Sequence, residues 1–190
     1  MAWELPEGLE LAFSPEVPLL ASPAVREQGV GRGNSQLHLG AQLALRYAVA
    51  PRIWLSAAMG GRTQNLEWSP PQPEDPRIFV EHRSLRLQLG AQYLFTDALT
   101  QPYVQGAAGL ASASWSLDAG QRVAERASRG ASFSLGLGVQ RQLTPHLGLG
   151  AELRGFGELY SAQTITVDAR DFEQPPGRLG FGLAVVLLLR

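Results

Sequence analysis

The chain has 190 residues and a net charge of −1, with 16 basic and 17 acidic side chains. This balance gives no electrostatic reason to expect a nucleic-acid partner. The chain has no cysteine, which excludes disulfides, thiolate nucleophiles and cysteine-ligated metals. No apolar run reaches the ~18–20 residues of a membrane helix. The length suits one domain, which we expect to span residues 1–190.

The first predicted element is a strand at residues 3–13. Apolar and polar residues alternate there, which is typical of a β-strand with two different faces. Leu9 and Leu11 belong to one face, and Glu10 belongs to the other. Residues 14–33 are interrupted by proline and glycine and predict a loop.

Three similar hairpins follow. The stretch "LGAQLALRYAVAPRIWLSAAMGG" begins at Leu39, and its pattern returns from Leu89 and from Leu137, at intervals of about 50 residues. Each copy has a Leu-Gly-(Ala/Val)-Gln strand, a short turn that ends in proline, and a second strand rich in Gly, Ala and Leu. The three prolines suit the first position of a strand, where a missing N–H is tolerated. Three hairpins in series are therefore predicted.

Polar segments separate the hairpins and predict long loops at residues 67–77, 118–130 and 166–178. A last alternating stretch ends the chain. We expect eight strands, at residues 3–13, 34–47, 53–65, 82–95, 103–115, 131–142, 146–159 and 178–190. An even number of antiparallel strands, with short turns at one end and long loops at the other, predicts an all-β fold: an eight-stranded antiparallel up-and-down transmembrane β-barrel.

The two faces of these strands differ in a way that favours a membrane. One face is apolar and almost free of charge, and the other is rich in Gly, Ala, Ser and Gln. A soluble exterior is normally about a quarter or more charged, so neither face suits water. Apolar side chains facing lipid need no charge, and small residues suit a narrow eight-stranded lumen. We therefore expect the apolar face to contact lipid.

Strand parity directs a set of charged side chains inward. The predicted network of the barrel interior comprises Glu10, Arg46, Arg86, Glu152 and Arg154. Arg62 shares their parity. An isolated charge in a narrow lumen is costly, so we expect these groups to be paired or hydrated. For Arg46 and Arg62, a position in water at the rim remains an equal alternative.

Aromatic residues gather near both ends of the strands, which favours two belts at the membrane interfaces. The group at the short turns is Tyr47, Tyr93, Phe95 and Tyr103. The group at the long loops is Trp68, Phe79, Trp115, Phe133 and Tyr160.

The segment "PYVQGAAGLA" from Pro102 resembles a strand opening of the small eight-stranded bacterial outer-membrane barrels, typified by the membrane domain of outer-membrane protein A. "PRIWLSAAMG" from Pro51 fills the same slot. The resemblance implies a location in the bacterial outer membrane, an N-terminus in the periplasm and long loops outside the cell. The chain departs from the family in ending on Leu189-Arg190 rather than on an aromatic residue.

Catalytic constellations are weak. His38, His82 and His146 lie on different predicted strands without metal-ligand spacing, so we expect no metal and no cofactor. Some outer-membrane barrels are lipid A deacylases with a His-x-Ser-Asn motif. Here "EHRSL" offers His82 and Ser84, but Leu85 replaces the asparagine, and strand parity directs the pair away from lipid. A polar pair without catalysis is the favoured interpretation.

Three functions remain open. The first is a barrel with a structural or surface-presenting role, such as adhesion or ligand binding by loops, without catalysis. The alternatives are a conduit for small or apolar molecules and a lipid A-modifying enzyme. The expected partner is the lipid bilayer of the outer membrane, including its lipopolysaccharide, and the expected state is a monomer. Specificity is expected in the loops, because residues 66–81 are net acidic and residues 117–130 slightly basic.

Overall fold

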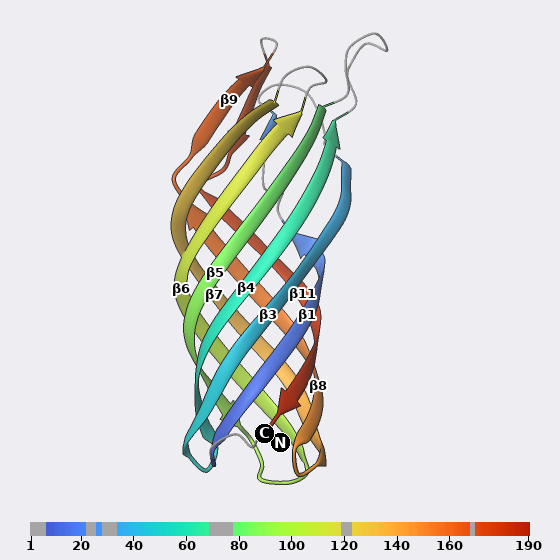
Figure 1. The fold of residues 1–190 in the computed structure, drawn as a ribbon, viewed down its shortest axis with the longest axis vertical. Helices are drawn as coiled ribbons and strands as arrows, with labels where there is room; N and C mark the ends of the chain where they lie inside the picture. The colour runs from blue at the N-terminus through green and yellow to red at the C-terminus, as the bar shows by residue number, and fades with distance from the viewer. Residues whose placement is uncertain (1–6, 22–25, 28–33, 69–77, 119–122, 168–169) are drawn as a thin grey trace, which may run out of the picture.

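Eight strands close into an antiparallel barrel, which confirms the predicted fold class (Figure 1). The structure, a computed structural model, describes residues 7–21, 26–27, 34–68, 78–118, 123–167 and 170–190. The barrel strands are β1 (Leu9–Ala21), β3 (Asn34–Ala50), β4 (Ile53–Trp68), β5 (Ile78–Leu94), β6 (Thr100–Asp118), β7 (Val123–Thr144), β8 (Leu147–Tyr160) and β11 (Gly177–Leu189). Each strand pairs with the next one around the ring, and β1 closes the barrel against β11. The described residues include no helix that is long and apolar enough to span a membrane.

The first strand differs from its prediction. It begins at Leu9 and runs to Ala21, through a segment that was expected to be a loop because of its prolines. Alternation continues through this segment, with Glu16 buried and Val17 exposed. Pairing of β1 with β3 stops at Glu16, and the register with β11 shifts after Pro18. Pro18 therefore lies beyond the β1–β3 ladder and beside an irregularity, where a missing N–H costs little.

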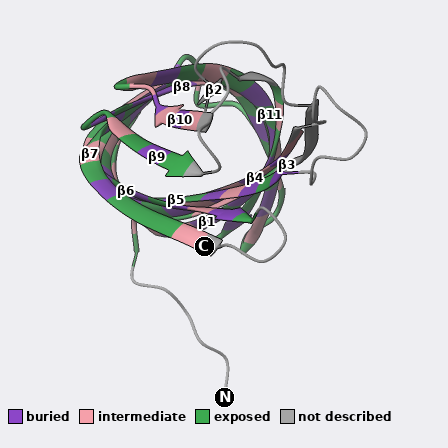
Figure 2. Ribbon diagram, turned by 90° about the horizontal axis from the view of Figure 1, so that it is seen from above, coloured by how far each residue is buried: buried purple, intermediate pink, exposed green. Residues whose placement is uncertain are grey.

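A second, smaller sheet was not predicted. It contains β2 (Arg26–Glu27), β9 (Gln163–Val167) and β10 (Arg170–Gln174), in the order β2-β10-β9. Figure 2, which looks down the barrel, shows these strands across its mouth at the long-loop end. Residues 166–178 were expected to be a loop because of their charges and prolines. Four of the five residues of "QTITV" (163–167) are β-branched, which is a sequence signal for a strand.

Two further segments expected to be loops are partly strand. The strands β6 and β7 extend to Asp118 and from Val123, into the predicted loop 118–130. The strand β4 likewise extends to Trp68, into the predicted loop 67–77, of which residues 69–77 lie outside the described residues. The short connections of the barrel lie at the end that also holds the start of β1 and the C-terminus of the chain (Figure 1).

Side chains on each barrel strand alternate between lipid and lumen. On β5, the side chains of Leu87 and Leu89 are 54% and 73% exposed. The alternate residues Arg86 and Gln88 are only 1% and 5% exposed. Figure 2 shows exposed and buried positions alternating along the strands, and the large exposed apolar side chains come from all eight barrel strands. A soluble monomer rarely exposes so continuous an apolar surface. The outer face therefore suits the hydrocarbon of a bilayer, as predicted.

The predicted aromatic belts are only partly present. Five members point outward and are exposed: Tyr47, Phe79, Tyr93, Phe95 and Phe133. Three others are buried in the lumen: Tyr103, Trp115 and Tyr160. These three occupy inward positions of β6 and β8. Nearness to a strand end therefore does not by itself predict that an aromatic side chain faces outward. The side chain of Trp68 lies outside the described residues.

Candidate functional site: the barrel lumen and its mouth

The lumen near the short turns contains an ion pair on Glu10, which β1 directs inward. Its carboxylate accepts hydrogen bonds from Arg46 Nη1 at 3.2 Å and from Arg190 Nε at 2.7 Å. Glu10 and Arg46 are both buried, so Arg46 lies inside the lumen and not in water at the rim. The bond between Glu10 and Arg190 joins the first barrel strand to the end of the chain.

The middle of the lumen is organised around Glu152 on β8. Its carboxylate accepts hydrogen bonds from Arg154 Nε at 2.5 Å, Tyr103 OH at 2.7 Å and Gln105 Nε2 at 2.7 Å. Arg154 also donates to the side-chain carbonyl of Gln42, on the opposite wall. A buried carboxylate with several donors is well compensated. This cluster therefore ties β3, β6 and β8 together across the lumen.

Two inward glycines make room for this cluster. A methyl group on Gly136 would lie 2.6 Å from Glu152 Oε1, and one on Gly138 would lie 2.5 Å from the Tyr103 ring. Real carbon atoms do not approach this closely, so neither side chain could keep its place beside alanine. At these two positions the inward glycines therefore accommodate large side chains from neighbouring strands.

The upper lumen contains the largest charge cluster, which we call the Glu158 cluster: Glu16, Arg62, Arg86, Glu158 and Arg178. Arg62 Nη2 donates to Glu16 at 2.5 Å. The guanidinium nitrogens of Arg62, Arg86 and Arg178 lie 3.7–3.8 Å from the carboxylate of Glu158. All five residues are buried. The cluster thus places three cations around one carboxylate, with Glu16 as the second anion.

Aromatic and polar groups complete the surroundings of this cluster. The guanidinium carbon of Arg62 lies 3.2 Å from the centre of the Phe156 ring, a cation–π contact.

The described lumen contains five buried arginines and four buried glutamates. The buried arginines therefore outnumber the buried glutamates by one.

An apolar cluster closes the lumen at the long-loop end. Its buried members are Leu66, Ile78, Val80, Trp115, Leu117, Ile165 and Phe172. The first five come from the barrel wall, whereas Ile165 and Phe172 come from β9 and β10 of the small sheet. Hydrogen bonds from Ser128 Oγ to Gln174 and from Gln163 Nε2 to the Ala127 carbonyl, at 3.0 and 2.8 Å, hold this sheet to β7. We call β9, β10 and this apolar cluster the mouth cap.

His82 and Ser84 face the lumen and are both buried. Ser84 Oγ donates to Glu158 at 3.2 Å, so its hydroxyl joins the Glu158 cluster. Neither side chain faces lipid, where acyl chains lie. Within the described part of the chain, no three His, Asp or Glu side chains are grouped as metal ligands. The side chain of His38 lies outside the described residues.

Several solved structures with the same fold are outer-membrane proteins of bacteria. Neisserial surface protein A superposes with a TM-score of 0.54 at 15% sequence identity, covering 96% of this chain and 97% of that one. OprG from Pseudomonas aeruginosa gives 0.51 at 14%, with 94% and 95% covered. The outer-membrane protease OmpT from Escherichia coli gives 0.50 at 8%, with 96% and 93% covered. The chain has the fold of the bacterial outer-membrane β-barrels. No protein-family model and no curated protein sequence matches it.

The barrel places the predicted lumen residues in three groups, and the middle and upper groups meet where Arg154 Nη1 lies 3.8 Å from Glu16. Glu10 pairs with Arg46, Glu152 pairs with Arg154, and Arg86 joins the Glu158 cluster. Glu16, Glu158 and Arg178 are further buried lumen residues, outside the predicted set. Glu158 and Arg178 occupy the same alternate positions as the charged or small inward-facing residues of their own strands. The alternation of the sequence therefore predicts that both side chains face inward. Glu16 was missed because its segment was expected to be a loop.

Proposed function

We propose that this protein is a non-catalytic, monomeric barrel of the outer membrane that presents its long-loop end to the outside of the cell. The observation that carries the proposal is the occupied lumen. Ion pairs fill its lower, middle and upper parts, and the mouth cap covers the end at the long loops. A barrel filled in this way is a rigid scaffold for the surfaces at its ends.

The filled lumen argues against the conduit alternative. A solute crossing the barrel would have to displace the buried partners of Glu152 and Glu158, and would leave buried charges without compensation. Breaking one such pair typically costs about 3–5 kcal/mol. The solute would also have to lift Phe172 and Ile165 out of an apolar cluster. Eight strands enclose little space beyond that of their own side chains.

The burial of His82 and Ser84 supports the absence of lipid A deacylation. A deacylase has to bring its nucleophile to an acyl chain, and acyl chains contact the outer face of the barrel. Ser84 is inward, and its hydroxyl donates to a carboxylate. A surface role leaves specificity to the loops, where binding residues are common on rigid scaffolds. The acidic segment 66–81 and the basic segment 117–130 would then differ in what they attract.

Conductance across a planar bilayer tests the proposal. Refolded protein, shown to be folded by its heat-dependent mobility on gels, should give no stable single-channel steps. A matched variant that removes the mouth cap, with residues 163–174 replaced by a short Gly/Ser linker, should also stay closed because the Glu158 cluster remains. Steady conductance by the unaltered protein would replace the surface role with the conduit role. Release of acyl chains from lipid A that Ser84→Ala abolishes would replace it with the enzyme role.

A further inference from the structure

Arg86 on β5 is a buried cation whose guanidinium group makes no hydrogen bond. Among the described residues, none accepts a hydrogen bond from its Nε, Nη1 or Nη2 atom. Its ionic contact is with Glu158, whose Oε1 atom lies 3.8 Å from Arg86 Nε. A charge-assisted hydrogen bond between such groups is about 2.7–2.9 Å long. Arg86 is therefore held by a longer ionic contact alone.

The two carboxylates of the Glu158 cluster are bonded to other side chains. Glu16 accepts a hydrogen bond from Arg62 Nη2 at 2.5 Å. The Glu158 oxygen that faces Arg86 accepts a hydrogen bond from Ser84 at 3.2 Å, and it also lies 3.7 Å from Arg62 Nη1. Arg86 thus shares a single carboxylate oxygen with a hydroxyl and a second guanidinium group.

The charge of Arg86 has to be compensated inside the barrel. Arginine stays protonated in proteins, so the charge is not relieved by the loss of a proton. A buried charge is costly unless it is both paired and hydrogen-bonded. Water would accept hydrogen bonds from the guanidinium group but would leave its charge uncompensated. A small anion would do both.

Small residues lie on both sides of Arg86 in the wall of the lumen. Its partners directly across the sheet are Gly60 on β4 and Ala111 on β6, and both are buried. A Cβ atom on Gly60 would lie 3.2 Å from Arg86 Nη2, so the end of the guanidinium group lies over this glycine. Arg86 therefore lies between two wall positions that carry no side chain beyond Cβ.

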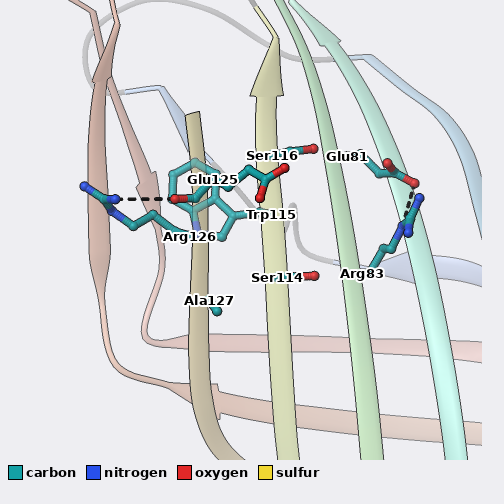
Figure 3. A pocket seen from close by; sticks show the side chains of 8 residues that line it. All are labelled: Glu81, Arg83, Ser114, Trp115, Ser116, Glu125, Arg126 and Ala127. Carbon is teal, nitrogen blue, oxygen red and sulfur yellow. Dashed lines mark hydrogen bonds and ion pairs between the residues drawn. The ribbon is translucent and has the colours of Figure 1, made fainter. Parts of the chain in front are cut away.

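Arg83, three residues earlier on β5, shows how the same side chain is satisfied outside the lumen. It points to the outer side of the sheet and donates a hydrogen bond to Glu81 Oε1 at 2.8 Å (Figure 3). Its side chain is 66% exposed, so water also reaches its guanidinium group. Arg86 is closed to bulk water, and the described residues give it no such acceptor. The need for a further anion is therefore specific to Arg86.

We propose that the lumen binds one small monovalent anion, chloride or an ion of similar size, at the guanidinium group of Arg86. The anion accepts hydrogen bonds from the Nη atoms beside Gly60 and compensates the charge that Glu158 shares with other cations. A larger or more highly charged anion would meet the carboxylates of Glu16 and Glu158, which repel it. The ion is enclosed when the barrel closes during folding. This inference goes beyond the proposed function and does not depend on which end of the barrel faces outward.

Crystals of the protein refolded in bromide test the site directly, because bromide scatters X-rays anomalously. Crystals of protein refolded in gluconate, a large organic monovalent anion, are the control. We expect one anomalous peak within hydrogen-bond distance of the Arg86 guanidinium group in the bromide crystals and none there in the gluconate crystals. Water alone at Arg86 in the bromide crystals would overturn the proposal.

A chloride titration measures the same site in lipid vesicles, with gluconate exchanged for chloride at constant ionic strength. An ion that binds only the folded state raises the folding equilibrium constant about tenfold for each tenfold rise in its concentration above the Kd. Arg86→Gln should abolish this dependence on chloride, whereas Arg83→Gln, on the outer side of the same strand, should keep it. No dependence in the unaltered protein, or equal dependence in the two variants, would overturn the proposal.

A carboxylate fixed beside Arg86 should replace the ion. Ala111→Asp places this carboxylate directly across the sheet from Arg86, where Cβ atoms are about 4.5–5.5 Å apart. Its stability should no longer depend on chloride and should exceed that of the unaltered protein in gluconate. The matched control is Ala113→Asp, a buried position of β6 opposite Ser84, which should be less stable than the unaltered protein in both salts. Chloride dependence that persists in Ala111→Asp would contradict an ion at Arg86.

Discussion

The lumen and the outer wall of this barrel are built from the same strands and have opposite chemistry. Arg86 and Leu87 are neighbours on β5, yet Arg86 is buried among charged groups and Leu87 faces outward in a continuous apolar surface. In a soluble protein, charges go to the surface and leucines to the core. Here the surrounding hydrocarbon reverses the arrangement, and every inward charge has to be compensated inside the barrel. We therefore expect that adding a charge destabilises the barrel when it is placed on the outer face, and that removing a charge destabilises the barrel when it is taken from the lumen.

The largest effect is expected from removing the central carboxylate of the lumen. Glu158→Ala leaves Arg62, Arg86 and Arg178 without their shared anion and should destabilise the barrel by about 3–5 kcal/mol. The free energy of unfolding is measured by urea titration of the protein folded in lipid vesicles. The matched control is Glu81→Ala, which removes an exposed carboxylate and should cost less than about 1 kcal/mol. Equal losses in the two variants would mean that the Glu158 cluster does not stabilise the fold.

A charge placed on the outer face should have the next largest effect. Leu87→Arg puts a guanidinium into the apolar band and should cost about 2–4 kcal/mol if Leu87 lies near the midplane of the bilayer. Its neighbour Gln88 donates a hydrogen bond to Ser132 at 3.2 Å inside the lumen. Gln88→Leu should therefore cost only about 1 kcal/mol. Similar unfolding energies for the two variants, measured in the same vesicles, would show that the faces are assigned wrongly.

A smaller, local effect is expected at the mouth cap. Phe172→Ala removes a fully buried ring from the apolar cluster but leaves the ion pairs below it in place. The β9–β10 hairpin should open more often, so its backbone amides should exchange with deuterium faster while those of β5 and β6 keep their protection. Faster exchange throughout the barrel would indicate that the cap and the lumen unfold as one unit.

The smallest effect concerns the short turns. Arg52 donates two hydrogen bonds to Asp97 Oδ2, at 2.7 and 3.0 Å, in exposed surroundings. These hydrogen bonds hold the pKa of the Asp97 carboxyl below its ordinary value. The stabilisation is present above the ordinary pKa and is lost as the pH falls through the lowered pKa. An NMR titration of Asp97 should show the lowered pKa, and Arg52→Gln should return it to the ordinary range. An ordinary pKa in the unaltered protein would contradict this pairing.

Period-two alternation explains why most of the fold could be predicted from the sequence. It locates eight strands and assigns the inward positions of Arg86, Glu152 and Arg154, because each position depends only on its neighbours along one strand. The inward position of Glu16 could not be predicted in this way, because the prolines around it predict a loop although alternation continues through them. The small sheet was missed for a similar reason, because charges and prolines around "QTITV" obscured its β-branched residues.

Partners across the lumen could not be predicted in the same way. Arg62 on β4 meets Glu16 on β1 and Glu158 on β8, which are far apart in the sequence. Which charges meet depends on the tilt and stagger of all eight strands after the barrel has closed.

The most direct test of the central claim, a barrel with a lipid-facing wall and a closed lumen, is nitroxide scanning along β5. The chain has no cysteine, so single-cysteine variants at each position from Leu85 to Leu89 can be labelled without further changes. In bilayers, labels at 85, 87 and 89 should collide often with oxygen, which concentrates in hydrocarbon. Labels at 86 and 88 should collide rarely with both oxygen and a water-soluble nickel complex. Frequent collision of the nickel complex with labels at 86 and 88 would show an open aqueous lumen and contradict the account.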